Sequence, residues 1–130
     1  MTQRTAIREK IKNLIAPHFV SAFDFRPVAM NEDQLPAAFV YLEVGETEVD
    51  HDDEYMDTAL LNIEMTVHGM GNLDAQLDQL ADLVNNEFKN NPTVDGAILG
   101  IQRSGWTYDP DPETLTNALT LSYQIIYDED

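Results

Sequence analysis

Two segments of alternating hydropathy between Pro36 and His68 constrain the fold of this chain more than any other feature. In residues 38–44, and again in residues 61–68, apolar side chains occupy every second position. A period of two is that of a β-strand with one face buried. Two such segments in succession predict an antiparallel hairpin.

The segment that connects these two strands is dense in carboxylates, and Gly45 gives a turn signal at its start. Buried interiors do not accept unpaired charges at such density, so we expect an exposed loop that projects beyond the sheet. Exposed loops of this kind often carry function. The acidic side chains of this connection are Glu46, Glu48, Asp50, Asp52, Asp53, Glu54 and Asp57.

Residues 3–16 have the periodicity of an amphipathic helix that ends before Pro17. Beside its apolar face lie Arg4, Arg8 and Lys12, which are spaced by four residues and therefore form a basic stripe. Such a stripe is either a solvated face or a docking strip for an acidic surface on another protein or another copy.

Leucine, alanine, valine and phenylalanine recur at spacings of three and four in residues 73–90, which predicts a second helix with Asn72 as its N-cap. Further strands are predicted at residues 19–25, 97–108 and 115–127. The order helix, strands, helix, strands predicts one α+β domain over residues 1–130. We expect a mixed, mainly antiparallel sheet of four to five strands with two helices packed on one face.

Charge and hydropathy restrict the partners. The formal net charge of −17 repels phosphate, which argues against DNA or RNA as a direct partner and favours proteins or cations. No apolar run approaches the roughly 20 residues that a membrane helix needs. No signal-peptide pattern precedes the first helix. We therefore expect a soluble protein that does not bind membranes.

The sequence carries no recognisable catalytic or metal-binding motif. Calcium-loop spacings that start at Asp50 or Asp109 lack the glycine and the glutamate that such a loop requires. Cysteine is absent, and the three histidines do not have the spacing of a ligand set; they are His18, His51 and His68. We expect no enzyme activity, no metal site and no cofactor.

Aromatic side chains suggest a binding surface instead. Trp106 and Tyr108 share one face of a predicted strand, and together with Tyr41 they could form a platform. Such residues are usually core or one side of a protein interface, so an interface is favoured over a small-molecule site.

Several segments, in this order and spacing, resemble the minor tail protein U family of lambda-like long-tailed bacteriophages, the tail terminator proteins. The matching segments, with their sequences, are Arg26 and Pro27, residues 35–42 (LPAAFVYL), the acidic connection, residues 61–64 (LNIE), the helix at Leu77 and Asp78, residues 104–108 (SGWTY) and residues 121–127 (LSYQIIY). The agreement extends over nearly the whole chain and is weakest in the loops.

This resemblance implies an assembly role without catalysis. Members of the family form a hexameric ring that caps the growing tail tube, stops polymerisation of the tube protein and offers a surface to the head-tail joining protein. The implied location is the head-proximal end of the virion tail, after assembly in the host cytoplasm. The implied partners are other copies of the chain, the tail tube protein and the joining protein.

Two site hypotheses follow from combining this implication with the charges. For the subunit interface we expect Arg4, Arg8 and Lys12 to face Asp74 and Asp78 of the neighbouring copy. For the surface that faces the tube we expect the acidic connection between Glu46 and Asp57, on the ground of its exposure and charge density.

Two other functions remain open at this point. The main alternative is an acidic protein-binding module or a DNA mimic, which would compete with DNA for a basic target. A small hydrolase or metalloenzyme is a third interpretation, but the sequence offers neither a nucleophile constellation nor a ligand set for it.

Overall fold

The computed structural model describes residues 3–27, 30–49 and 55–128, and within them the chain forms an α+β fold. Its helices are α1 (Gln3–Ile15) and α2 (Leu73–Asn90), with short 3-10 turns at Ala16–His18 and Glu32–Gln34. Its strands are β1 (Ser21–Phe23), β2 (Ala37–Val49), β3 (Tyr55–His68), β4 (Gly100–Asp111) and β5 (Thr116–Asp128).

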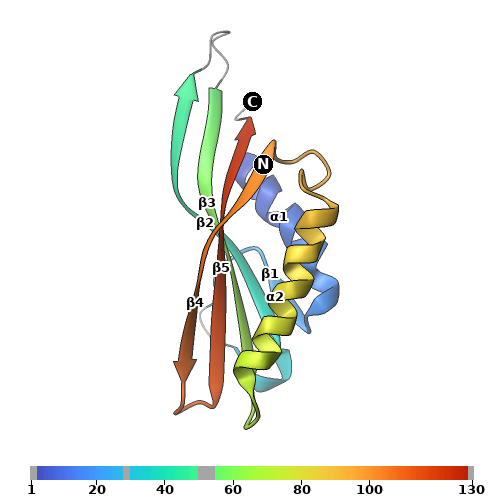
Figure 1. Cartoon of the computed structure of the whole chain (residues 1–130), viewed down its shortest axis with the longest axis vertical. Helices are drawn as coiled ribbons and strands as arrows, with labels where there is room; N and C mark the ends of the chain where they lie inside the picture. The colour runs from blue at the N-terminus through green and yellow to red at the C-terminus, as the bar shows by residue number, and fades with distance from the viewer. Residues whose placement is uncertain (1–2, 28–29, 50–54, 129–130) are drawn as a thin grey trace.

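The five strands form one sheet in the order β1-β2-β3-β5-β4. β1 pairs parallel to β2, and every other neighbouring pair is antiparallel. Both helices lie on the same face of this sheet (Figure 1). The predicted mixed sheet with two helices on one face is therefore confirmed.

The core lies between the helices and the sheet. Every second residue of β3 and β5 points into it, as the alternating sequence predicted, and Leu61, Ile63, Leu119 and Ile125 are examples of these buried side chains. From the helices, the buried positions are spaced by three, four or seven residues, and they are Ile7, Ile11, Ile15, Leu77, Ala81, Val84 and Phe88. Neither helix, among the residues described, is long and apolar enough to cross a membrane.

The β2–β3 hairpin is longer than the sequence predicted. Both strands continue into the acidic connection, so the backbone at Glu46, Glu48 and Asp57 is strand rather than loop. Gly45 lies at an irregularity in the β2–β3 register instead of at a turn. A Cβ there would approach the Thr58 carbonyl oxygen to 2.6 Å, so close strand pairing requires glycine at this position.

The prediction that the whole acidic connection is exposed was wrong for Asp57. This residue is 5% exposed, because its side chain points to the helix side of the sheet, opposite Tyr127 in the register. Glu46 is exposed as predicted. Asp50, Asp52, Asp53 and Glu54 lie outside the described residues. Beyond the helices, the two hairpin strands project at the end of the molecule where both chain termini lie (Figure 1).

Candidate functional site: the groove between α2 and β4

The helix layer is narrower than the sheet. α1 packs on β1 and β2, and α2 packs on β3 and β5. β4, at the edge of the sheet, extends beyond α2, and nearly all of its residues past Ile101 are exposed. A groove therefore runs between α2 and the helix-side face of β4, with β5 as its floor.

The part of this groove beside the N-terminal half of α2 is lined by aromatic and acidic side chains. Trp106 and Tyr108 stand on the helix-side face of β4, and their rings meet edge to face with centroids 5.5 Å apart. Asp78 and Asp82 of α2 face them across a hollow of about 470 Å³, and Leu121 belongs to its floor. Trp106 is 68% exposed, which is unusual for a side chain with so large an apolar area.

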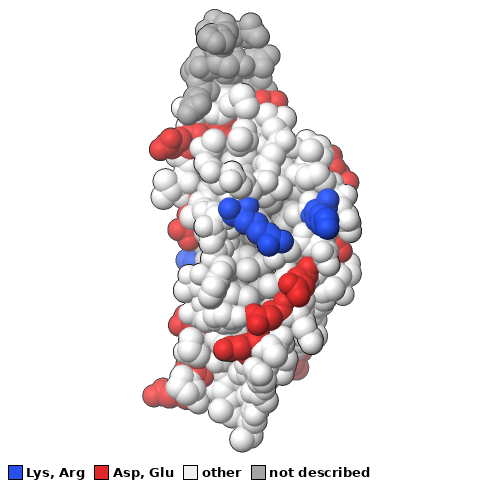
Figure 2. All heavy atoms as spheres, viewed as in Figure 1, with Lys and Arg blue, Asp and Glu red and all other residues white. Residues whose placement is uncertain are grey.

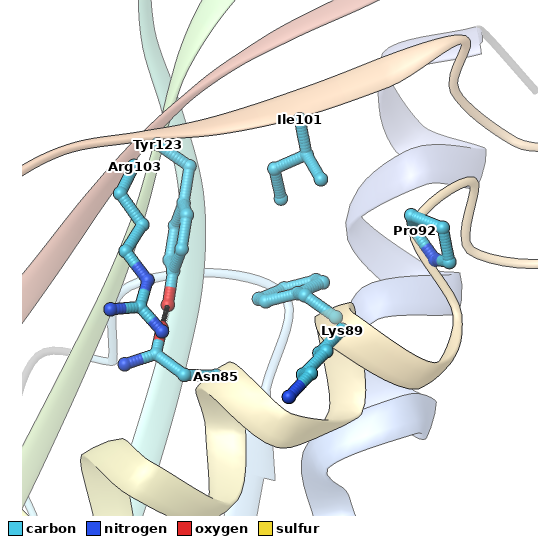
Figure 3. Close-up of a pocket in the computed structure, with 7 residues that line it drawn as sticks. Asn85, Lys89, Pro92, Ile101, Arg103 and Tyr123 are labelled. Carbon is cyan, nitrogen blue, oxygen red and sulfur yellow. Dashed lines mark hydrogen bonds between the residues drawn. The ribbon is translucent and has the colours of Figure 1, made fainter.

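The part of the groove beside the C-terminal end of α2 is basic. Lys89 from α2 and Arg103 from β4 line a second hollow of about 280 Å³. Figure 3 shows Arg103 lying along the ring of Tyr123 and reaching towards Asn85. On the surface, a line of acidic side chains over α2 lies below basic side chains on the same face (Figure 2). The groove is therefore acidic at one end and basic at the other.

Three side-chain hydrogen bonds fix the width of the groove. In order from the N-terminus of α2, Asn117 donates to Asp74, the Tyr108 hydroxyl donates to Asp78, and the Tyr123 hydroxyl donates to Asn85. α2 itself begins where Asn72 accepts a hydrogen bond from the Ala75 amide at 3.1 Å, as the sequence predicted. These contacts hold α2 at a defined distance from β4 and β5.

The environment of the groove changes the acidity of two tyrosines. The hydrogen bond to Asp78 is the main reason that the pKa of Tyr108 is raised to about 12, because ionisation would place two negative charges together. Burial raises the pKa of Tyr123, and the nearby Arg103 partly opposes this effect. Both phenols are therefore neutral donors at physiological pH.

We expect Asp78→Asn to lower the pH at which Tyr108 ionises, because the substitution removes the carboxylate that opposes ionisation. The folded-state pKa of Tyr108 lies above the unfolded value of about 10, so this contact stabilises the fold below that pH and loses its effect as pH rises towards 12. Spectrophotometric titration of tyrosine measures the shift. Asp82→Asn, on the same helix, is the control and should leave the curve unchanged; equal curves for the two variants would contradict this assignment.

The structure brings only some of the predicted site residues together. Asp74 and Asp78 lie on the groove wall, but both already accept hydrogen bonds within their own subunit. Arg4 is exposed, and Arg8 and Lys12 are half-buried, on α1. Within the described residues no ion pair includes any of these three cations.

The predicted aromatic platform divides between the two faces of the sheet. Tyr41 belongs to the face opposite the helices, where the Arg26 guanidinium lies 3.8 Å from its ring centroid. It therefore cannot join Trp106 and Tyr108, and its grouping with them was wrong. Asp82, Lys89 and Arg103 were not proposed from the sequence, although the four-residue spacing of Asp74, Asp78 and Asp82 was a usable signal.

The histidines have structural partners. His18 lies 2.8 Å from Glu87 and ties the 3-10 turn after α1 to α2, and His68 lies 3.3 Å from Glu32. His51 is outside the described residues. Among the residues that the structure describes, no three His, Asp or Glu side chains form a group that could hold a metal ion.

Comparison with known proteins identifies the family. A family model described as phage minor tail protein U matches residues 2–127. A search of curated proteins finds no match. One solved structure that matches in fold is a chain of the virion of a native gene transfer agent particle, with a TM-score of 0.54 and 10% identity, over 96% of this chain and 92% of that one. Because the family model covers nearly the whole sequence, this chain belongs to the phage minor tail protein U family.

Proposed function

We propose that this protein is a tail terminator, which forms a ring on the end of the tail tube, stops tube polymerisation and presents a surface for head joining. The observation that carries the proposal is the family match over residues 2–127, which supports a structural role in a phage tail. The proposed location is the head-proximal end of the tail, reached during assembly in the host cytoplasm. No catalytic step is part of this proposal.

For contact with the tube we propose the distal part of the β2–β3 hairpin, from Glu46 to Asp57. Its support is the length of the two strands, which extend well beyond the helices (Figure 1). The exposure of Glu46 adds to this support. Asp57 is buried on the helix side of the sheet, so it is not proposed to touch a partner.

The charge of the chain sets a condition on ring formation. A hexamer, the assembly that the family resemblance implies, would gather six chains that each carry a formal net charge of −17. Like charges at this density repel one another unless counterions screen them or opposite charges meet at the contacts. Ring assembly must therefore work against a long-range repulsion.

We expect ring formation to strengthen when salt or millimolar divalent cations are added, because both reduce this repulsion. Sedimentation velocity across a series of ionic strengths measures the fraction of assembled protein. Salt also weakens any ion pairs at the contacts between subunits. The change in the assembled fraction therefore shows whether the reduced repulsion or the weakened ion pairing has the larger effect. A ring that dissociates on addition of salt and magnesium would contradict the expectation.

A further inference from the structure

On the face of the sheet that carries the helices, one strip has no helix above it. α1 and α2 together span β1, β2, β3 and β5, and the helix-side face of β4 lies beyond them. Trp106 stands on this strip and exposes 68% of its surface. A further helix placed beside α2 would cover β4 and remove this indole from water.

The acidic side chains on the wall of the groove indicate that such a helix should be basic. Asp74, Asp78 and Asp82 follow α2 at intervals of four residues, which is roughly 6 Å along the helix axis, and all three are exposed. A helix that lies next to them should carry cations at the same interval. Lys89 and Arg103 at the other end of the groove restrict those cations to the half of the groove beside Asp74, Asp78 and Asp82.

This chain contains a helix of that kind. Arg4, Arg8 and Lys12 of α1 recur at intervals of four residues and make up three of the seven basic side chains in the sequence. They have no ion-pair partner among the described residues of their own subunit. Charge and spacing of α1 therefore complement those of the groove.

The basic flank of α1 faces away from the groove of its own subunit. Gln3 donates a hydrogen bond at 3.3 Å to the carbonyl oxygen of Ala97, in the segment after α2, so the side of α1 that carries Gln3 faces α2. Ile7 and Ile11 point into the core. Arg8 follows Ile7 and Lys12 follows Ile11. Each of these cations therefore lies about 100° further around the helix than the core-facing isoleucine before it, on the side away from Gln3. The stripe thus lies towards the β1 edge, and the groove lies at the β4 edge.

From this arrangement we infer that α1 of one subunit docks in the α2–β4 groove of the next, with Arg4, Arg8 and Lys12 beside Asp74, Asp78 and Asp82. The inference rests on the proposed ring and names its contact. Because the two surfaces lie at opposite edges of one chain, the contact is head-to-tail, as a closed ring requires. Trp106 packs against the neighbouring helix, and the aliphatic parts of its basic side chains cover the indole.

Disulfide trapping tests this contact directly, because the natural chain has no cysteine. Purified Arg8→Cys and Asp82→Cys chains are mixed under the conditions that give the most assembly, and then oxidised. Each chain keeps two of its three complementary charges. We expect a covalent dimer that contains one chain of each variant, identified by mass spectrometry, and no comparable product from either variant alone. Mixing two singly substituted chains excludes a bond within one subunit.

Thr107→Cys is the matched control. Thr107 is exposed on the same strand as Trp106, and its side chain points to the other face of the sheet. Mixed with Arg8→Cys, it should give no covalent dimer. Equal yields with Thr107→Cys and Asp82→Cys would overturn the inference.

Charge reversal supplies a second readout that does not depend on disulfide geometry. Arg8→Glu should weaken association by about tenfold or more, and Asp82→Lys in the same chain should restore it. Rings that form normally with Arg8→Glu and give no trapped dimer would refute this contact and leave the terminator proposal standing. A natural chain that neither forms rings nor limits tube length would refute both.

Discussion

Replacement of Phe88 by alanine is expected to lower the free energy of unfolding by about 3–5 kcal/mol. Phe88 is 4% exposed on α2, and its ring meets that of Tyr123 edge to face at a centroid distance of 5.0 Å. The substitution leaves a cavity under the helix that forms one wall of the groove. Since a domain of this size is stable by about 5–15 kcal/mol, the variant would lose a large share of its stability.

Leu83→Ala is the matched control, because Leu83 lies on the same helix and is 40% exposed. It should cost about 1 kcal/mol, since Leu83 is only partly buried and the smaller substitution loses less buried area than Phe88→Ala does. Urea unfolding followed by circular dichroism compares the two variants. If Phe88→Ala were no less stable than Leu83→Ala, Phe88 would not be part of the packing of α2 on β5.

Reversal of charge in the hairpin connection is expected to give tails of unregulated length. The variant carries Asp50→Lys, Asp52→Lys and Asp53→Lys, and we expect it to form the ring but not to stop the tube, because the charge proposed to meet the tube has been inverted. Electron microscopy of tails, made by a phage that depends on the variant, measures the length distribution.

A control for total charge is available on the same chain. Asp33→Lys, Asp95→Lys and Glu113→Lys change three exposed acids outside the hairpin and give the same net charge as the hairpin variant. This control should yield tails of normal length. Normal lengths from both variants would exclude the hairpin connection as the surface that faces the tube.

The periodic elements were predictable from sequence because their patterns record burial. Residues 61–68 alternate strictly, and the structure places them in a central strand whose apolar side chains are buried. The second helix has apolar residues at spacings of three and four, begins after the predicted cap Asn72 and ends at Asn90. In both cases local pattern and tertiary packing agree.

The limits of the hairpin were not predictable by the same reasoning. Charge density indicated an exposed loop, but strand pairing continues through Thr47 and Asp57, where backbone hydrogen bonds do not depend on hydropathy. Likewise, the strand predicted to end at Tyr108 continues to Asp111, and Asp109 to Asp111 pair with β5 in an edge strand. An edge strand tolerates proline, because one side of it needs no donor.

The groove could be predicted only in part. The shared face of Trp106 and Tyr108 follows from strand alternation, and the acidic line on the second helix follows from its spacing. The order of the strands was not evident from local sequence, and this order leaves β4 outside the cover of α2. The convergence of Lys89 and Arg103 at the basic end of the groove depends on the same tertiary arrangement.

The most direct test of the central proposal is the mass of the purified protein together with its negative-stain image, in low salt and again with millimolar magnesium. The proposed function predicts closed rings of identical subunits, more abundant in magnesium, and masses that are a fixed multiple of the 14.7 kDa chain. A protein that remains monomeric in both buffers and also fails to form rings on the end of a tail tube would contradict it.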